Sequence, residues 1–206
     1  MSGSPKRSLR LRRSTACTTL EQTCMRDDDL AFRQPITLRD GREALIRVMR
    51  PDDKERLQSA FAKLDPQSVY TRFFSVRKEL PERAFERIAE IDFIKLAGLV
   101  VTIGDGADEI VIGSASYVGH TEGDGAKVAE VAFTVEEDFQ GQGLASRLLA
   151  ALITLARRHG LVRLEAEVLA GNAPMLAVFE RSGLPVSRRR ESGVIHLSLD
   201  LAAPPG

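Results

Sequence analysis

The chain has 206 residues, of which 43% are apolar and 28% are charged, as is usual for a soluble globular protein. Its 29 Lys and Arg residues are balanced by 29 Asp and Glu residues, which excludes the strong positive field of a sequence-independent nucleic-acid binder. No apolar run approaches the roughly 20 residues of a membrane-spanning helix. We therefore expect neither a nucleic-acid nor a membrane partner.

Both cysteines, Cys17 and Cys24, lie near the N-terminus, so a disulfide framework is not expected to hold the core together. A zinc site needs clustered ligands, whereas the three histidines lie far apart in the sequence. These histidines are His120, His159 and His196. We expect no metal, and a reducing, cytoplasmic compartment.

Residues 1–35 differ in composition from the rest of the chain. Five basic residues precede the first acidic one, Glu21, and no apolar stretch resembles a secretory signal. The segment is interpreted as a charged, disordered tail, or as an extension upstream of a true start at Met25. An organellar transit peptide is the third alternative. Residues 36–206 are expected to form one folded domain.

The domain is predicted to begin with one strand followed by helices. Residues 44–48 (ALIRV) predict a strand, and the helical spacing of apolar residues predicts a helix over 52–64. A second short helix is expected over 65–74. A third begins at Pro81, because proline is favoured in the first turn of a helix.

Three strands follow, over 96–103, 110–118 and 128–135. The dipeptides Asp105-Gly106 and Asp124-Gly125, which lie between them, are typical of tight turns. Because the connections are short, the three strands are predicted to pair as an antiparallel meander.

After residue 143 the hydrophobic period changes from 2 to 3.6, which predicts a helix that ends at Gly160. Its apolar stripe consists of Leu144, Leu148, Leu152 and Leu155. A strand over 161–169, a helix over 174–181 and a strand over 194–201 complete an α+β fold, with one central sheet and helices on its faces. His159 is explained by the helix end and His196 by the strand surface, so neither is predicted to be catalytic.

A glycine-rich segment, residues 140–145 (QGQGLA), joins a predicted strand to this helix. Its glycines allow a ligand to approach the backbone, and the free N–H groups of the first helical turn favour a pyrophosphate. A connection without a ligand is the plain alternative. A dinucleotide fingerprint, Gly141-x-Gly143-x-x-Ser146, lacks its third glycine and follows hairpin-linked strands instead of a βαβ crossover.

With these motifs the chain resembles the GNAT superfamily of acyl-CoA-dependent N-acetyltransferases. The family motif Gln/Arg-x-x-Gly-x-Gly/Ala matches residues 140–145, and a second element matches Asn172 through Ser182-Gly183-Leu184. The resemblance covers roughly residues 45–201. It implies a three-layer α/β/α fold, in which a central, mostly antiparallel twisted sheet is splayed to form an acyl-CoA cleft.

The resemblance also implies a site for acetyl-CoA as cosubstrate. The pantetheine would pair with the backbone of Phe133, Thr134 and Val135, and Asn172 would lie near the thioester. The phosphate-binding turn would comprise Gln140, Gly141, Gln142, Gly143, Leu144, Ala145 and Ser146. Many relatives place a Tyr seven residues after the Asn as a general acid, but this chain has Phe179 there.

Glu130 is the candidate general base. It shares a face with Ala132 and Thr134 in an otherwise apolar strand, where partial burial would raise its pKa. Residues 129–133 (AEVAF) also resemble the strand that carries the catalytic Glu in histone and bacterial protein-lysine acetyltransferases. A solvated Glu that opens a strand is the plain alternative.

The acceptor is predicted less directly. Residues 68–74 (SVYTRFF) resemble a segment of bacterial protein lysine acetyltransferases, and Tyr70 and Phe73 would line the substrate groove. An amphipathic helix with core aromatics explains them as well. We expect a lysine ε-amine on a protein such as acetyl-CoA synthetase. A small amine or antibiotic acceptor and a non-catalytic acyl-CoA sensor remain alternatives.

Overall fold

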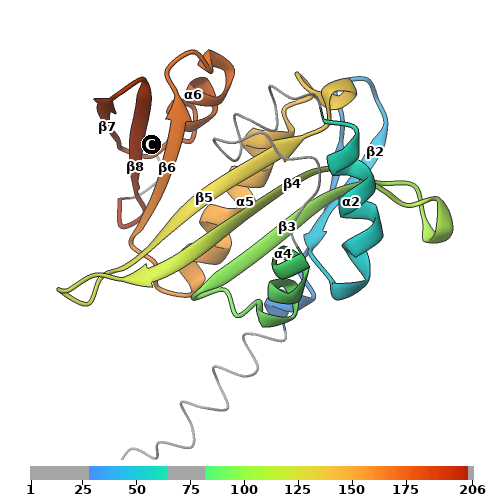
Figure 1. The fold of residues 1–206 in the computed structure, drawn as a ribbon, viewed down its shortest axis with the longest axis horizontal. Coiled ribbons are helices and arrows are strands. Elements are labelled where there is room, and N and C mark those ends of the chain that lie inside the picture. Colours follow the sequence, from blue (N-terminus) through green and yellow to red (C-terminus); the bar gives the residue numbers. More distant parts are fainter. Residues whose placement is uncertain (1–27, 65–81, 204–206) are drawn as a thin grey trace, which may run out of the picture.

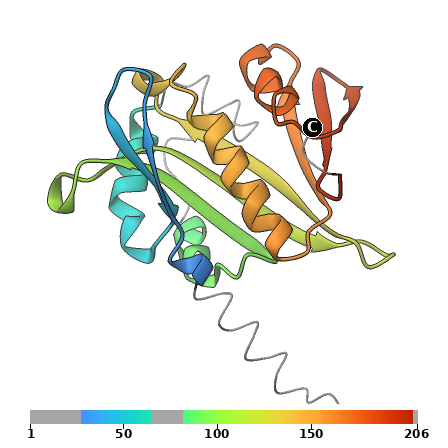
Figure 2. The same ribbon diagram turned by 180° about the vertical axis from the view of Figure 1, so that it is seen from behind.

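The computed structural model describes residues 28–64 and 82–203. Within them, one eight-stranded sheet has the order β1-β2-β3-β4-β5-β6-β8-β7. Helices α5 (Leu144–Arg158) and α6 (Ala173–Glu180) lie on one face, and α2 (Lys54–Ala62) and α4 (Glu82–Glu86) lie on the other (Figures 1 and 2). The expected three-layer α/β/α arrangement is confirmed.

Of the seven pairs of neighbouring strands, six are antiparallel, and β5 and β6 pair in parallel. The strands are β1 (Arg33–Thr37), β2 (Glu43–Val48), β3 (Leu96–Ile103), β4 (Ile110–Thr121), β5 (Lys127–Val135), β6 (Arg163–Leu169), β7 (Val186–Glu191) and β8 (Val194–Asp200). The predicted meander is formed by β3, β4 and β5. Short 3-10 helices accompany these elements. Pro51–Asp53 precedes α2 and Arg87–Glu90 follows α4, while Gly106–Asp108 and Glu137–Phe139 lie in loops.

Neither edge strand, β1 or β7, was predicted from the sequence. Strand β1 (RQPIT) buries only Ile36, and β7 (VSRRRE) is exposed along almost its whole length. Neither shows the alternation of apolar and polar residues by which a half-buried strand is recognised. Charged residues and a proline are common on sheet edges, where they discourage pairing with other chains. The helix expected over 65–74 lies outside the described residues.

Strands β5 and β6 pair in parallel over only three residue pairs, from Val128↔Arg163 to Glu130↔Glu165. Beyond Glu130 the two strands diverge, so the β6-facing edge of β5 from Val131 to Val135 has no strand partner among the described residues. Figure 1 shows the resulting opening between β5 and β6. The predicted splayed sheet is therefore present.

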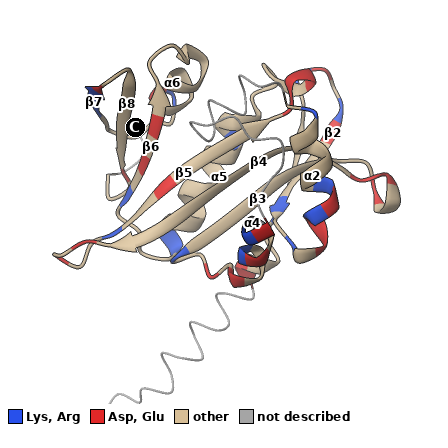
Figure 3. Cartoon of the chain, in the orientation of Figure 1, with Lys and Arg blue, Asp and Glu red and all other residues tan. Residues whose placement is uncertain are grey.

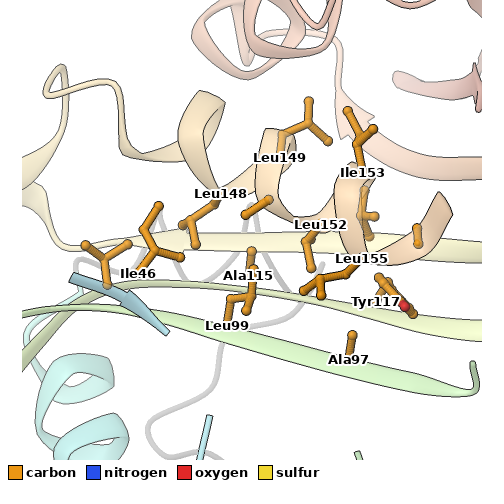
Figure 4. Close-up of a cluster of buried hydrophobic side chains, with 14 of the residues drawn as sticks. Ile46, Ala97, Leu99, Ala115, Tyr117, Leu148, Leu149, Leu152, Ile153 and Leu155 are labelled. Carbon is orange, nitrogen blue, oxygen red and sulfur yellow. The ribbon is translucent and has the colours of Figure 1, made fainter. Parts of the chain in front are cut away.

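Helix α5 packs its leucine stripe onto the centre of the sheet. Leu148, Leu152 and Leu155 are completely buried against a face that includes Ala115 and Tyr117 of β4 (Figure 4). Burying one such leucine contributes about 1.5–3 kcal/mol. This contact anchors the helix, and with it the glycine-rich loop at its N-terminus.

The described part of the fold includes residues that precede the expected domain boundary at residue 36. Strand β1 starts at Arg33, and the side chain of Asp29 is only 1% exposed. Its Oδ2 lies 2.6 Å from Nε2 of His159 and its Oδ1 lies 2.8 Å from Nη1 of Arg158, both at the C-terminal end of α5. Residues assigned to the tail therefore contribute to the core, because a buried carboxylate needs these partners.

A buried ion cluster ties α2 to the sheet. The guanidinium of Arg47 on β2 donates two hydrogen bonds to Asp53, at 2.7 and 2.6 Å, and one to Glu109 at 3.1 Å. Burial alone would raise the pKa of Asp53, but the hydrogen bonds from Arg47 and from the backbone of Arg50 hold it below its usual value. Both charges are thus satisfied inside the protein.

Candidate active site

The glycine-rich loop adopts a backbone that suits an anion. Gly141 and Gly143 have φ values of 76° and 82°, a region that favours glycine. A Cβ at either position would meet no heavy atom within 4 Å, so the space beside both is open. Gly143 is the N-cap of α5, and no side chain caps the helix. The first-turn N–H groups are therefore available to a phosphate.

The other predicted loop residues surround these two glycines. Gln140 is exposed and its N–H donates to the carbonyl of Glu137, which closes the preceding 3-10 turn. Gln142 donates from Nε2 to Asp40 at 3.2 Å. Leu144 is buried, while Ala145 and Ser146 of the first helical turn are half-buried. The structure thus brings the predicted phosphate residues together at the N-terminus of α5.

Phe133, Thr134 and Val135 lie on the part of β5 whose β6-facing edge is unpaired. Their free backbone groups can pair with an extended, amide-containing ligand such as pantetheine. Phe133 contacts Phe179 of α6 edge-to-face, with ring centroids 5.9 Å apart. This contact packs α6 against β5 on the helical side of the opening.

Asn172 and Phe179 both belong to α6. Asn172 is its N-cap, and its Oδ1 accepts a hydrogen bond of 3.2 Å from the backbone N–H of Met175. Its side-chain amide still has N–H donors to offer a ligand. Phe179 is only 1% exposed and carries no hydroxyl group. The position that holds a Tyr in many relatives therefore provides packing in this chain.

Glu130 lies at the point where β5 and β6 separate. It pairs in register with Val118 on one side and with Glu165 on the other. Within residues 28–64 and 82–203, no hydrogen bond or ion pair engages its carboxylate. The expected partial burial is wrong, because Glu130 is exposed. The hollow beside it is lined only by strand residues, so no described helix covers this part of the face.

Two hollows lie on the sheet face that bears Glu130; Val118 lines one, and its register partner Glu130 lines the other. The first, about 350 Å³, is mostly apolar and lies beneath α2 and α4, with Ser116 and Val118 on its floor. The second, about 370 Å³, is polar and lies over β6, β8 and β7. Figure 3 shows acidic positions on β5 and β6 beside the opening. An amine could reach Glu130 from this face.

The polar hollow also contains two carboxylates, Glu165 and Glu167, which were considered from the sequence only as the acidic residues of a dinucleotide fingerprint. Glu165 accepts from Nε of Arg163 at 3.0 Å, and Oε1 of Glu167 lies 3.3 Å from Nδ1 of His196. The alternation of these two residues along β6 was the signal that the local sequence offered. Their proximity to Glu130 depends on the pairing of β5 with β6. His196 is a half-buried strand residue, as predicted.

Tyr70 and Phe73, the expected groove residues, lie outside the described residues. Across residues 28–64 and 82–203, no group of three or more His, Cys, Asp or Glu side chains is arranged to hold a metal ion. In the same ranges no helix is long and apolar enough to cross a membrane.

Comparison with known proteins decides the family. The profile of the acetyltransferase (GNAT) domain matches residues 44–185. The chain belongs to the GNAT acetyltransferase family. The family is one of acetyltransferases.

Among curated proteins, GNAT relatives include acetyltransferase Pat of Mycolicibacterium smegmatis, 38% identical over 168 residues. The match covers 81% of this chain and 48% of Pat, so the chain spans about half the length of that relative. The solved GNAT domain of S. lividans PAT is 35% identical, with a TM-score of 0.71, and the match covers 82% of this chain and 96% of that domain.

A more distant structure carries the cosubstrate. It is yncA, a putative acetyltransferase from Salmonella typhimurium with its cofactor acetyl-CoA, 20% identical with a TM-score of 0.63. The match covers 79% of this chain and 98% of that protein. At this identity the likeness establishes only a shared fold.

Proposed function

We propose that this GNAT domain transfers the acetyl group of acetyl-CoA to a lysine ε-amine of a protein, with Glu130 as general base. The position of Glu130 carries the proposal. It stands where the unpaired edge of β5 begins, lines the polar hollow and pairs in register with Val118, which lines the apolar one. A carboxylate there is within reach of both an acyl donor along β5 and an amine from the opposite face.

The acyl donor would lie along the opening between β5 and β6. Its pyrophosphate would bind the free N–H groups of Gly143, Leu144 and Ala145, and its pantetheine would pair with the edge of β5 at Phe133–Val135. In this orientation the thioester would lie near Glu130, where β5 and β6 separate, since β5 leads from the loop back to that residue.

Glu130 would make the nucleophile available. A lysine amine at pH 7 is protonated, and removing that proton costs about 4–5 kcal/mol. The carboxylate accepts one proton from the ammonium, and the amine nitrogen attacks the thioester carbonyl. The nitrogen then loses a second proton to water, and the C–S bond breaks to release the CoA thiolate. The solvent exposure of Glu130 allows it to pass the proton to water afterwards.

The leaving group needs little help from the protein. Phe179 cannot donate a proton, but a thiol has a pKa of about 8.5 and leaves readily as a thiolate. Solvent at the open face can supply the final proton. The Phe at this position is therefore compatible with catalysis, which favours an enzyme over a non-catalytic acyl-CoA sensor.

Three observations support a lysine acceptor. The apolar hollow could pack the methylene stem of a lysine, whose ammonium would then meet Glu130. The open polar face over β6 and β8 leaves room for a polypeptide on either side of that lysine. Similarity to acetyltransferase Pat and to the PAT GNAT domain agrees with this choice.

The base is tested with Glu130→Gln, which preserves shape and removes the proton acceptor. We expect unchanged acetyl-CoA affinity and a kcat lower by about 10²–10⁴ at pH 7. The deficit should shrink at high pH, where more amine is already free. Glu191→Gln, another exposed strand glutamate, serves as the matched control. Wild-type turnover of the Glu130 variant at pH 7 would remove this residue from the mechanism.

The acceptor is tested by offering acetyl-CoA with purified acetyl-CoA synthetase, alongside a panel of free amines and aminoglycosides. Mass spectrometry should find acetyl-lysine on the protein well above the level without enzyme. Rapid acetylation of one small amine, with no protein labelling above background, would favour the small-molecule alternative. Absence of CoA release with every acceptor tested would favour the non-catalytic acyl-CoA sensor.

A further inference from the structure

The turn between β1 and β2 is attached to the glycine-rich loop, although the two segments are about 100 residues apart in sequence. Nη1 of Arg39 donates to the carbonyl oxygen of Gly141 at 2.7 Å. Nε2 of Gln142 donates to Asp40 at 3.2 Å, a contact in the opposite direction. Figure 2 shows this turn lying beside the loop that leads into α5.

Two further contacts extend the attachment along both segments. Nη2 of Arg147, in α5, donates to the carbonyl oxygen of Thr37 at 3.0 Å. The guanidinium of Arg42 stacks over the ring of Phe139, 4.5 Å from its centroid. The turn thus contacts the segment before the loop at Phe139, the loop itself at Gly141 and Gln142, and α5 at Arg147.

The attachment concentrates positive charge at the loop. It brings together the three cations Arg39, Arg42 and Arg147, near the carboxylates of Asp40 and Glu43. Asp40 is already engaged, because Arg42 donates to it from Nε and Nη2. Arg39 uses only Nη1 toward the protein, and its other N–H groups have no partner among the described residues. Three arginines beside the loop can attract a polyphosphate.

Arg39 also acts on the geometry of the loop. In a trans peptide the C=O and the next N–H point in opposite directions. A hydrogen bond on the carbonyl of Gly141 therefore fixes the direction of the N–H of Gln142, on the other side of the peptide. Because Gly141 is exposed and lacks a side chain, little else restrains this peptide plane.

We propose that Arg39 is a positioning residue of the acyl-CoA site, which holds the Gly141–Gln142 peptide and the loop around it in the phosphate-binding conformation. The inference rests on the proposed binding of acetyl-CoA at this loop. It makes the β1–β2 turn, which lies outside both family motifs, part of the machinery that sets affinity for the cosubstrate. The chemical step at Glu130 does not depend on it.

The test compares Arg39→Ala, Arg39→Lys and the control Arg33→Ala. Arg33 is an exposed arginine of β1 whose side chain makes no hydrogen bond or ion pair to the loop among the described residues, so its removal changes the net charge equally. CoA binding is measured by calorimetry, and KM and kcat by steady-state kinetics. Arg39→Ala should raise the Kd for CoA and the KM for acetyl-CoA about 5- to 20-fold, as expected for one charge-assisted hydrogen bond at an exposed site.

The kcat of Arg39→Ala should stay within about twofold of wild type, and Arg39→Lys should restore most of the affinity, since a lysine can also donate to the carbonyl. A general structural defect would lower kcat and would not be rescued by lysine. Wild-type CoA affinity in Arg39→Ala, or equal loss in Arg33→Ala, would overturn the inference. Failure of the wild-type protein to bind CoA would instead overturn the proposed function.

Discussion

Replacing Gly143 by Asp places a negative charge at the point where the structure offers free helical N–H groups. The change introduces no clash, because a Cβ at this position has no heavy atom within 4 Å. It does introduce backbone strain, since φ is 82° and a non-glycine residue pays about 1–2 kcal/mol there. Gly143→Asn is the matched control, because Asn has the same size and also tolerates this region.

The difference between the two variants isolates the charge. A carboxylate about 5 Å from one phosphate charge is repelled by about 3 kcal/mol at an effective dielectric constant of 20, and by about 0.8 kcal/mol in water. Gly143 is half-buried, so the value lies between these limits. We expect the Asp variant to bind CoA about 5- to 150-fold more weakly than the Asn variant.

Calorimetry with CoA measures this ratio, and thermal unfolding with and without CoA gives an independent reading, because a ligand that binds only the native state raises Tm. The ratio should fall as salt screens the repulsion. Equal affinities of the Asp and Asn variants would show that no phosphate lies near Gly143. The pyrophosphate assignment, and the argument for the acyl donor's path along β5, would then be wrong.

Two further predictions concern stability. Asp53→Asn breaks the buried contact with Arg47 and should cost about 3 kcal/mol in urea unfolding at pH 7. The pKa of Asp53 is lowered in the folded protein, so the wild type's advantage should be full above about pH 4 and vanish as the pH falls further. Asp29→Ala leaves buried His159 without its partner and should cost about 1–3 kcal/mol, with unchanged CoA affinity, because the pair lies at the far end of α5. Unaltered unfolding of this second variant would show that residue 29 does not contribute to the core.

Local patterns in the sequence were sufficient to predict the loop and helix of the proposed cosubstrate site. The period of the leucines in α5, the two glycines before it and the Asn that begins α6 all act within one or two turns of the chain. Their consequences follow from backbone geometry and intrahelical hydrogen bonds, which depend on nearby residues alone. The hairpin of β4 and β5 was predictable for the same reason, since its turn dipeptide is local.

Tertiary structure decided the remainder, because it joins residues that no spacing connects. The contact of Asp29 with His159 spans 130 positions, and that of Arg39 with Gly141 spans 102. The alternation in β5 placed Glu130 on one face of a sheet but carried no information on which helices cover that face. The exposure of Glu130 depends on where α2 and α4 end. Its position at the point where β5 and β6 separate depends on where β6 pairs. Burial is a property of the assembled layers, and a strand's own residues do not determine it.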